Sequence, residues 1–343
     1  MAEPLRGILV GLGGRGRYWN TACRTFPDVE LVAYVEPFAG SRETGIKAGV
    51  APDRIYETFD QALSTLNGEA DFVLDVTPPG QHETVATQAF GAGLHLIGEK
   101  PLSDDFTAAR RIVAAGKQAG VRHMITQNYR FGAQPRTTRR LVNEGVIGAI
   151  GQIDINFYMP WADRAGTHYV TEPYMFTKDM GIHHFDMIRY VSGKDPVSAR
   201  CISWNPAWGW HQGDGSHLAL FTFDNGARAV HRGAGSAVGT KTTWNGEWRI
   251  EGPGGSITWE GADMYLTHLH RTEQRRREQI FPDKAVHGDG ADALLHEFVS
   301  AIREGREPEC NASDNIRSLA MVEACVRSAQ TGGLDVTIAD LLT

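Results

Sequence analysis

The sequence has few cysteines, no long apolar run and no excess of positive charge, and each absence excludes a class of protein. The four cysteines, Cys23, Cys201, Cys310 and Cys325, lie far apart and include no C-x-x-C pair, so they match neither a zinc site nor a disulfide framework. We expect them to be reduced and buried, and we expect no metal. No stretch approaches the roughly 20 consecutive apolar residues that cross a bilayer. The net charge of −7 argues against nucleic-acid binding, which normally needs a basic face.

What remains is the composition of an ordinary globular protein. A chain of 343 residues corresponds to about two domains, at roughly 150 residues each. Hydrophobic residues make up 41% and charged residues 22%, enough to bury a core. The first residues, MAEPLRGILVGLGGRG, contain no apolar stretch long enough for a signal peptide. We therefore expect a cytoplasmic protein that does not bind membranes.

The first third of the chain alternates short apolar runs with helical patterns. The runs predict strands over 7–10, 29–35, 72–76, 94–97 and 121–126. Helical patterns follow the first, third and fourth of these runs, ending near residues 26, 90 and 119. Strands that alternate with helices are typical of a parallel sheet covered by helices on both faces. We predict a doubly wound α/β domain over residues 1–126.

After residue 126 the apolar residues alternate with a period of two. This pattern predicts strands over 148–158, 197–204, 217–223, 227–232, 244–251 and 256–260, several joined by hairpin-type turns. Helices are expected over 177–191, 291–303 and 312–330. We predict that residues 127–343 form an α+β domain with a mainly antiparallel, open sheet.

The first predicted strand runs directly into a G-x-G-x-x-G sequence, Gly11-Leu12-Gly13-Gly14-Arg15-Gly16. The first glycine permits a tight turn, the second lets the backbone approach a pyrophosphate, and the third allows close packing of helix on strand. The helix that begins here offers free N–H groups to phosphates, and either Arg15 or Arg17 can add a charge-assisted contact. Glycine trios arise by chance in a chain with 39 glycines, but this one lies between a strand and a helix. The context favours a dinucleotide-binding loop over an ordinary tight turn.

The second predicted strand ends at Glu36, twenty residues after Gly16 (36 − 16 = 20). An acidic side chain at about this distance accepts hydrogen bonds from the adenosine ribose and repels a 2′-phosphate. We therefore expect NAD as the cofactor. NADP stays possible because Ser41 and Arg42 follow closely and can meet a 2′-phosphate.

Two further motifs identify a family. They are Glu99-Lys100-Pro101, after a predicted strand, and the D-x-G-x-H-x-x-D sequence that begins at Asp179. With the glycine loop, they make the chain resemble the glucose–fructose oxidoreductase / inositol dehydrogenase / MocA family of NAD(P)-dependent oxidoreductases. The other matching pieces are Thr77-Pro78-Pro79 with His82, Asn128-Tyr129-Arg130-Phe131, and residues 311–333. The resemblance spans nearly the whole chain.

The resemblance implies a Rossmann domain followed by a substrate domain, and assembly as a homodimer or homotetramer through the sheet of the second domain. It implies that Lys100, Asp179 and His183 form the catalytic group. The residues that it assigns to the cofactor are Gly11, Gly13, Gly14, Arg15, Gly16, Glu36, Thr77, Pro78, His82, Glu99, Lys100 and Asn128. The family's usual aspartate at the end of the second strand is replaced here by Glu36, which leaves the choice between NAD and NADP open.

The chemistry of these side chains suits oxidation of an alcohol. Asp179 and His183 are four residues apart, so on a helix they share one face, with Cβ atoms about 5–6 Å apart. An imidazole titrates near neutral pH and suits His183 to accept the hydroxyl proton, while Lys100 favours the alkoxide. Asp179 would orient the histidine or a substrate hydroxyl. The alternative interpretations are that Lys100 is an ordinary solvated lysine and that His183 is a structural histidine. Because His184 lies next to His183, either histidine could be the one that acts.

Substrate contacts are harder to predict. Aromatic residues are frequent over 158–164 and 204–211, and flat rings suit the apolar faces of sugars, which indicates a sugar or polyol pocket. Tryptophans in core or subunit contacts are an equal alternative. Arg130 and Trp161 are the candidate substrate residues. Phe176-Thr177-Lys178 stands where many family members have small residues before the aspartate, which weakens any transfer of substrate identity.

Three functions therefore remain. The first is an NAD(P)-dependent dehydrogenase or reductase acting on a sugar, a polyol or a related small molecule. The second is a glycoside hydrolase or lyase that oxidises and re-reduces its substrate on a tightly held NAD. The third is a non-catalytic, NAD-responsive binding protein. The basic run 271–277 is interpreted as a solvated edge or a subunit contact.

Overall fold

The computed structural model describes residues 3–269, 275–283, 288 and 290–343, and the chain divides into two compact units. The first unit comprises Met1–Asn128 and His287–Ile316, and the second comprises Tyr129–Val286 and Arg317–Thr343. The sequence prediction placed the division after residue 126 and assigned everything beyond it to one domain. The chain instead returns to the first unit before it finishes the second.

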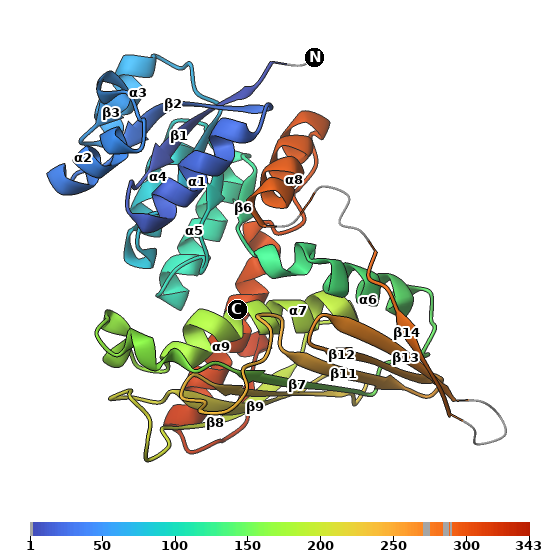
Figure 1. Ribbon diagram of the computed structural model, residues 1–343. Helices are drawn as coiled ribbons and strands as arrows, with labels where there is room; N and C mark the ends of the chain where they lie inside the picture. Colours follow the sequence, from blue (N-terminus) through green and yellow to red (C-terminus); the bar gives the residue numbers. More distant parts are fainter. Residues whose placement is uncertain (1–2, 270–274, 284–287, 289) are drawn as a thin grey trace. The chain divides into compact units, whose positions relative to one another are not determined.

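The first unit is built on a six-stranded parallel sheet in the order β3-β2-β1-β4-β5-β6 (Figure 1). Its strands are β1 (Leu5–Val10), β2 (Val29–Val35), β3 (Ile55–Tyr56), β4 (Phe72–Asp75), β5 (His95–Gly98) and β6 (His123–Ile125). This is the strand order of a dinucleotide-binding fold, and the predicted doubly wound sheet is confirmed. The short β3 was not predicted.

Helices connect these strands and cover the sheet. They are α1 (Gly14–Thr25), α2 (Ala39–Lys47), α3 (Phe59–Leu66), α4 (His82–Gly91), α5 (Phe106–Ala119) and α8 (Gly290–Glu304). The connections between the strands place helices on both faces, where α1 contacts α8 and α4 packs against α5 (Figure 1). Phe298 of α8 meets Phe72 of β4 edge-on, with ring centroids 5.4 Å apart. This apolar contact explains why α8, late in the sequence, folds with the first unit.

The second unit contains a nine-stranded sheet in the order β14-β13-β12-β11-β7-β10-β9-β8-β15. Its strands are β7 (Gln152–Tyr158), β8 (Ser198–Trp204), β9 (Ser216–Thr222), β10 (Arg228–Ala234), β11 (Glu247–Gly252), β12 (Gly255–Glu260), β13 (Asp263–Leu269), β14 (Arg275–Ile280) and β15 (Val336–Thr337). All pairs are antiparallel except β7 with β10, so the prediction of a mainly antiparallel sheet is confirmed. Of the basic run, residues 271–274 lie outside the described residues, and 275–277 begin the edge strand β14.

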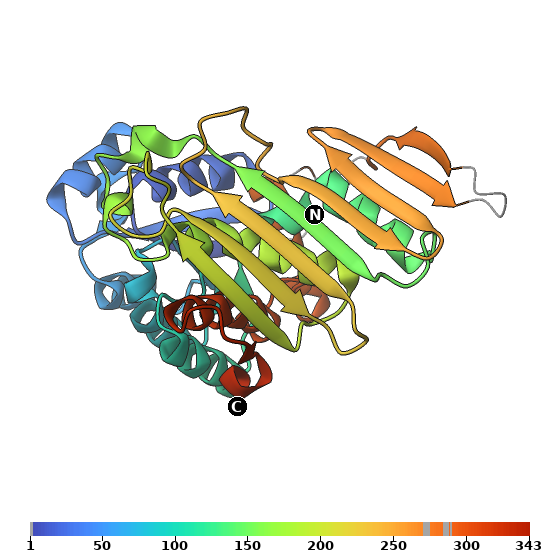
Figure 2. The ribbon, with the colours of Figure 1, turned by 90° about the horizontal axis from the view of Figure 1, so that it is seen from below.

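One face of this sheet is packed against helices and the other is open. The helices are α6 (Ala133–Asn143), α7 (Ile182–Ser192) and α9 (Ala312–Gln330), and a short α10 (Ala339–Leu342) ends the chain. Alternate residues of β7, namely Ile153, Ile155 and Phe157, are buried beneath the helices. Figure 2 shows the opposite face, which no helix of the described residues covers.

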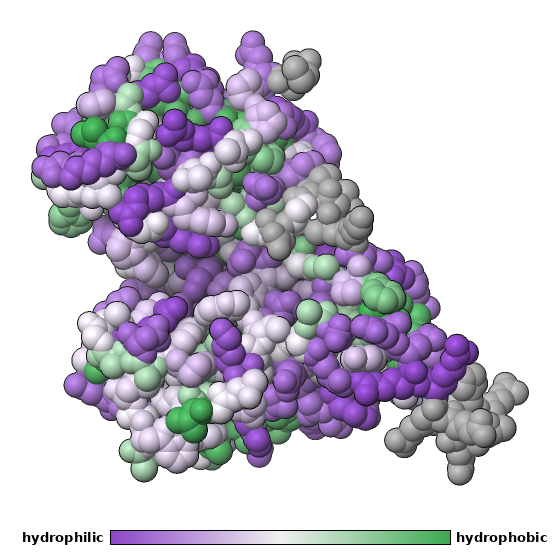
Figure 3. Space-filling model, viewed as in Figure 1, coloured by the Kyte–Doolittle hydropathy of each residue, from purple (hydrophilic) through white to green (hydrophobic). Residues whose placement is uncertain are grey.

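The surface is mixed in character. On the side shown in Figure 3, hydrophilic residues cover most of each unit, and apolar ones form small separate patches. The four cysteines are buried and form no disulfide with one another, as predicted. In the part of the chain that the structure describes, no helix has both the length and the apolar character to cross a bilayer.

Candidate functional site

The predicted cofactor residues gather at the carboxyl ends of the parallel strands, where folds of this kind bind ligands. Gly11 follows β1 with φ of 101°, in the left-handed region that favours glycine. A Cβ atom on Gly16 would lie 2.0 Å from the carbonyl oxygen of Gly11, so only glycine fits at the third position. Gly13 precedes α1, and no side chain among the described residues caps that helix. Because a Cβ on Gly13 or Gly14 would meet no atom within 4 Å, the loop leaves an open cradle before the helix N–H groups, as a pyrophosphate requires.

Glu36 lies at the end of β2 with only 4% of its surface exposed. Its carboxylate accepts hydrogen bonds from the backbone N–H of Leu12, at 2.8 Å, and of Phe38, at 3.0 Å. These bonds hold the acidic side chain against the glycine loop, in the place expected for a ribose-binding group. Arg42, the candidate partner of a 2′-phosphate, donates to the carbonyl oxygens of Glu36 and Pro37 and pairs with Glu57 at 2.8 Å. The arginine is therefore already held by oxygen acceptors, which favours NAD over NADP.

The loop after β4 is held by two neighbours. Thr77 donates both its backbone N–H and its hydroxyl to the buried carboxylate of Asp75, at 3.0 and 2.6 Å. The ring of His82 lies between two carbonyl oxygens, 3.0 Å from that of Thr77 and 3.0 Å from that of Pro101. His82 thus connects the loop after β4 to the turn after β5, and Pro78 lies exposed beside it. The Lys100–Pro101 peptide bond in that turn is cis.

Glu99 is a buried centre of hydrogen bonds in the first unit. One carboxylate oxygen accepts from the side chains of Arg15 and Trp19, both on α1. The other accepts from the Thr126 hydroxyl at 3.0 Å and from the backbone N–H of Lys100 at 3.2 Å. Glu99 thereby fixes Arg15 of the glycine loop and the backbone of Lys100 together. Lys100 itself is half-buried, and Asn128 is the last residue of the first unit before the chain crosses to the second.

In the second unit, Asp179 and His183 lie on one helical segment, but that segment is not a uniform α-helix. Residues Thr177–Gly181 form a π-helical turn, and α7 begins at Ile182. The predicted helix over 177–191 is therefore corrected at its first turn, where the backbone is wider. Single π-turns inside helices occur frequently at functional sites. Tyr174, just before the turn, has φ of 53°, an uncommon conformation for a bulky residue.

Two tyrosines flank Asp179. The Tyr169 hydroxyl donates to Asp179 at 3.4 Å. The Tyr129 ring stacks on the His183 imidazole, with centroids 4.2 Å apart and planes 14° apart. Burial, and next the negative charge of Asp179, raise the pKa of Tyr129 and the pKa of Tyr169. Both phenols therefore stay protonated, and neither tyrosine was predicted as a site residue.

His183 and His184 are separated by their surroundings. His183 is 6% exposed and lies against Tyr129, whereas His184 is fully buried in a chain of hydrogen bonds with His231 and His217. The two neighbours therefore have different surroundings, and His183 stays the candidate catalytic histidine because it stacks on Tyr129 instead of joining the buried histidines.

The two candidate substrate residues are both buried. Arg130 forms an ion pair with Asp186 inside the second unit, and its Nε donates to that carboxylate at 2.8 Å. Trp161 packs in an apolar cluster with Phe157, Met159, Met175, Phe176 and Met180. The Tyr169 ring lies 6.3 Å from the Trp161 ring and links this cluster to Asp179. Within the predicted aromatic stretch 204–211, Trp208 is exposed and Trp210 packs against the same cluster.

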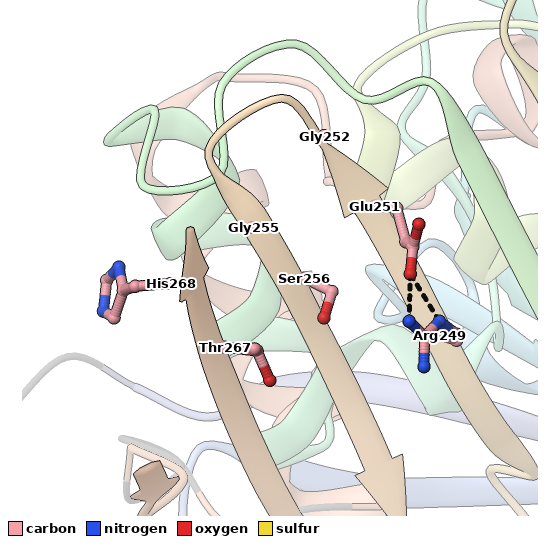
Figure 4. Close-up of a pocket in the computed structure, with 7 residues that line it drawn as sticks. All are labelled: Arg249, Glu251, Gly252, Gly255, Ser256, Thr267 and His268. Carbon is pink, nitrogen blue, oxygen red and sulfur yellow. Dashed lines mark hydrogen bonds and ion pairs between the residues drawn. The ribbon is translucent and has the colours of Figure 1, made fainter. Parts of the chain in front are cut away.

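A separate pocket of about 200 Å³ lies on β11, β12 and β13 (Figure 4). None of the predicted site residues lines it, and its Arg249 and Glu251 side chains pair with each other. This pocket is therefore separate from the predicted cofactor and catalytic residues. Among the described residues, no three His, Cys, Asp or Glu side chains converge as metal ligands.

Buried neutral histidines predict a loss of stability in acid. Burial lowers the pKa of His123 and His217 to about 3 and of His184 to about 4, and it holds the pKa of His231 well below its ordinary value. Below pH 6.5 the unfolded chain binds protons that the folded protein does not, so folding weakens as the pH falls from about 6.5 towards 4. We expect each histidine to cost on the order of 1 kcal/mol of unfolding free energy between pH 7.5 and 5.5. Urea unfolding at both pH values measures this, and equal midpoints would contradict it.

Comparisons with known proteins match both parts of the chain. The family description "Oxidoreductase family, NAD-binding Rossmann fold" matches residues 5–127, and "Oxidoreductase family, C-terminal alpha/beta domain" matches residues 139–338. D-apiose dehydrogenase of Paraburkholderia graminis is 25% identical over 342 residues, covering 96% of this chain and 89% of that protein. Inositol 2-dehydrogenase of Rhizobium meliloti is 24% identical over 93% of this chain and 95% of its own.

A solved structure shares the fold over nearly the whole chain. It is an oxidoreductase from Agrobacterium radiobacter in complex with NAD+, L-tartaric acid and magnesium, with a TM-score of 0.86 at 19% identity. The similarity covers 98% of this chain and 99% of that one. At this identity the comparison establishes the fold of both units.

Proposed function

The chain belongs to the Gfo/Idh/MocA oxidoreductase family, whose NAD-binding and C-terminal domains match it over 5–127 and 139–338, and from this premise we propose its reaction. We propose that it transfers a hydride between a nicotinamide cofactor and a secondary hydroxyl or ketone of a sugar, a polyol or a related small molecule. The names of the D-apiose and inositol dehydrogenases support this substrate class. The observation that carries the proposal is the π-turn segment that presents Asp179 and His183 among protonated tyrosines.

The first unit contains the NAD-binding domain, and its residues fit the cofactor. The open cradle at Gly13 and Gly14 would hold the pyrophosphate, and Glu36 would accept from the adenosine ribose. NAD supplies a nicotinamide carbon that accepts or returns a hydride. Because Arg42 is engaged by Glu57 and two carbonyl oxygens, we propose NAD rather than NADP.

We propose that three side chains of this protein assist the removal of the proton from the substrate hydroxyl. His183 accepts the hydroxyl proton, because an imidazole can take and return a proton near neutral pH. Lys100 supplies a positive charge that stabilises the negative charge developing on the substrate oxygen. Asp179, held by the Tyr169 hydroxyl, orients the substrate or the histidine. Trp161 and Tyr169 belong to the aromatic cluster beside Asp179 and suit the apolar face of a sugar.

Arg130 has a different role in this proposal. Its pairing with Asp186 makes it a support of α7 rather than a substrate ligand. The open face of the second sheet supports assembly as a homodimer or homotetramer.

The test is reduced-nicotinamide absorbance with purified protein, excess NAD and a pooled set of sugars and polyols. We expect NADH to rise well past one equivalent per chain, and division of the pool then identifies the substrate. A rise that stops at or below one equivalent contradicts net dehydrogenation. Products released without net NADH would instead indicate the redox-neutral hydrolase or lyase, and the absence of both would indicate a binding protein.

A further inference from the structure

Three fully buried histidines and one threonine form a continuous line of hydrogen bonds in the second unit. The Thr177 hydroxyl lies 2.9 Å from Nδ1 of His217, and Nε2 of His217 lies 2.8 Å from Nδ1 of His231. Nε2 of His231 lies 2.8 Å from Nδ1 of His184, and Nε2 of His184 lies 2.9 Å from the carbonyl oxygen of Trp244. We call Thr177, His217, His231 and His184 the histidine chain.

The far end of the histidine chain fixes its direction. A carbonyl oxygen only accepts, so Nε2 of His184 carries the hydrogen that points to Trp244. In a neutral imidazole the other nitrogen then accepts, so His231 donates to His184 and, by the same reasoning, His217 donates to His231. Burial lowers the pKa of all three, which keeps them neutral. The Thr177 hydroxyl is left as the donor to His217.

This direction excludes a proton relay. A proton that entered at Thr177 would have to leave at the Trp244 carbonyl, and a backbone carbonyl does not take up a proton at neutral pH. The histidine chain therefore holds its members in place instead of conducting charge.

The histidine chain holds the helical turn that contains Asp179. Thr177 is the first residue of the π-turn, and His184 lies three residues after its last residue, so the two side chains bracket the turn Thr177–Gly181. His217 and His231 come from the neighbouring strands β9 and β10, which pair antiparallel along their whole lengths. Gly233 of β10 leaves room for this arrangement, because a Cβ there would lie 2.9 Å from the His217 ring.

A threonine inside a helix commonly donates its hydroxyl to the carbonyl one turn earlier. Here the hydroxyl is directed to the sheet instead, which ties the start of the π-turn to β9. Single π-helical turns are rare and occur frequently at functional sites. The opposite end of the histidine chain holds the backbone of Trp244, whose ring lies 6.0 Å from that of Trp161 in the aromatic cluster beside Asp179.

We propose that the histidine chain positions Asp179 and His183 for hydrogen transfer, and that Thr177 is a positioning residue for the reaction. The proposal rests on the proposed function, since it concerns the same side chains. It adds residues that lie outside the motifs carrying the family resemblance, because His217 and His231 are contributed by the sheet.

The test compares Thr177→Val with Thr177→Ser. Valine keeps the shape of threonine but removes the donor to His217, whereas serine keeps the donor. We expect Thr177→Val to lower kcat at least tenfold with an unchanged Kd for NAD, because the cofactor residues lie in the first unit. Thr177→Ser should stay within about threefold of the parent, and both variants should unfold cooperatively.

Nitrogen-15 NMR of the histidine side chains provides a readout that does not depend on activity. In the parent protein we expect three neutral imidazoles with hydrogen on Nε2, and in Thr177→Val a shifted Nδ1 signal for His217 alone. An imidazolium or an Nδ1–H form among the three would overturn the direction of the histidine chain. Parental kcat in a folded Thr177→Val, or an equal loss in Thr177→Ser, would overturn the positioning role.

The failure of this proposal can be told from the failure of the proposed function. If the parent protein produces no NADH with the pooled substrates, the function itself fails and the positioning role falls with it, while the NMR result still decides the direction of the chain. If the parent is active and only the Thr177 variants depart from expectation, the positioning role alone is refuted.

Discussion

Replacement of Lys100 by methionine is expected to lower kcat/KM about 10³-fold and to leave the Kd for NAD within about threefold. Methionine has a similar length but no charge, so it removes the group that stabilises negative charge on the substrate oxygen. The turn itself should persist, because the Glu99 carboxylate accepts from the backbone N–H of Lys100, which the substitution leaves in place. Steady-state kinetics and NAD titration of the purified variant measure both quantities.

The matched control is Lys117→Met. Lys117 is an exposed lysine on α5 of the same unit, and its loss should leave both quantities unchanged. Lys100→Met with parental turnover would remove Lys100 from the catalytic group, whereas a large loss of NAD affinity would show that the lysine acts mainly through the cofactor.

Two alanine substitutions in the glycine loop are expected to impair NAD binding for different physical reasons. A Cβ on Gly16 would lie 2.0 Å from the Gly11 carbonyl oxygen, so Gly16→Ala must displace backbone. We expect it to destabilise the first unit by about 1–3 kcal/mol and to abolish NAD binding. A Cβ on Gly13 meets no atom within 4 Å, so Gly13→Ala should fold normally. It should nevertheless weaken NAD binding at least tenfold, because the methyl group occupies the space that a pyrophosphate must approach.

Thermal unfolding and NAD titration separate the two effects. Gly91→Ala, at the exposed end of α4, is the control, because its Cβ also meets no atom within 4 Å and it lies outside the loop. Parental NAD affinity in Gly13→Ala would place the pyrophosphate elsewhere, and a stable Gly16→Ala that binds NAD would contradict the requirement for glycine at the third position.

Much of the fold follows from local pattern. The apolar run over 29–35 coincides with β2, and the helical pattern over 312–330 coincides with α9. The glycine loop and Glu36 also lie where their spacing places them. These features depend on residues within a few positions of one another, so the printed sequence contains their cause.

Other elements were not predicted correctly, because their formation depends on contacts that are distant in the sequence or because they are too short to show a pattern. The β3 strand has two residues, too few to show any period. The strands β13 and β14 were not predicted, because polar and basic residues interrupt their alternation, and pairing with β12 is what makes them strands. The α8 helix was predicted but assigned to the second domain, because its packing on β4 depends on a phenylalanine more than 200 positions away.

The candidate site also combines features that local sequence determines with features that only the tertiary structure determines. The sequence by itself determined the fold class, the cofactor loop and the motifs that include Lys100, Asp179 and His183, since each is a short string of residue types with a local geometric meaning. Only the tertiary structure decided that His184 joins a buried hydrogen-bond chain while His183 stacks on Tyr129, that Arg130 pairs with Asp186, and that Tyr169 reaches Asp179. The physical reason is that a hydrogen bond or ion pair needs a partner within about 3 Å. Which residues come that close is fixed by strands and helices that are distant in the sequence.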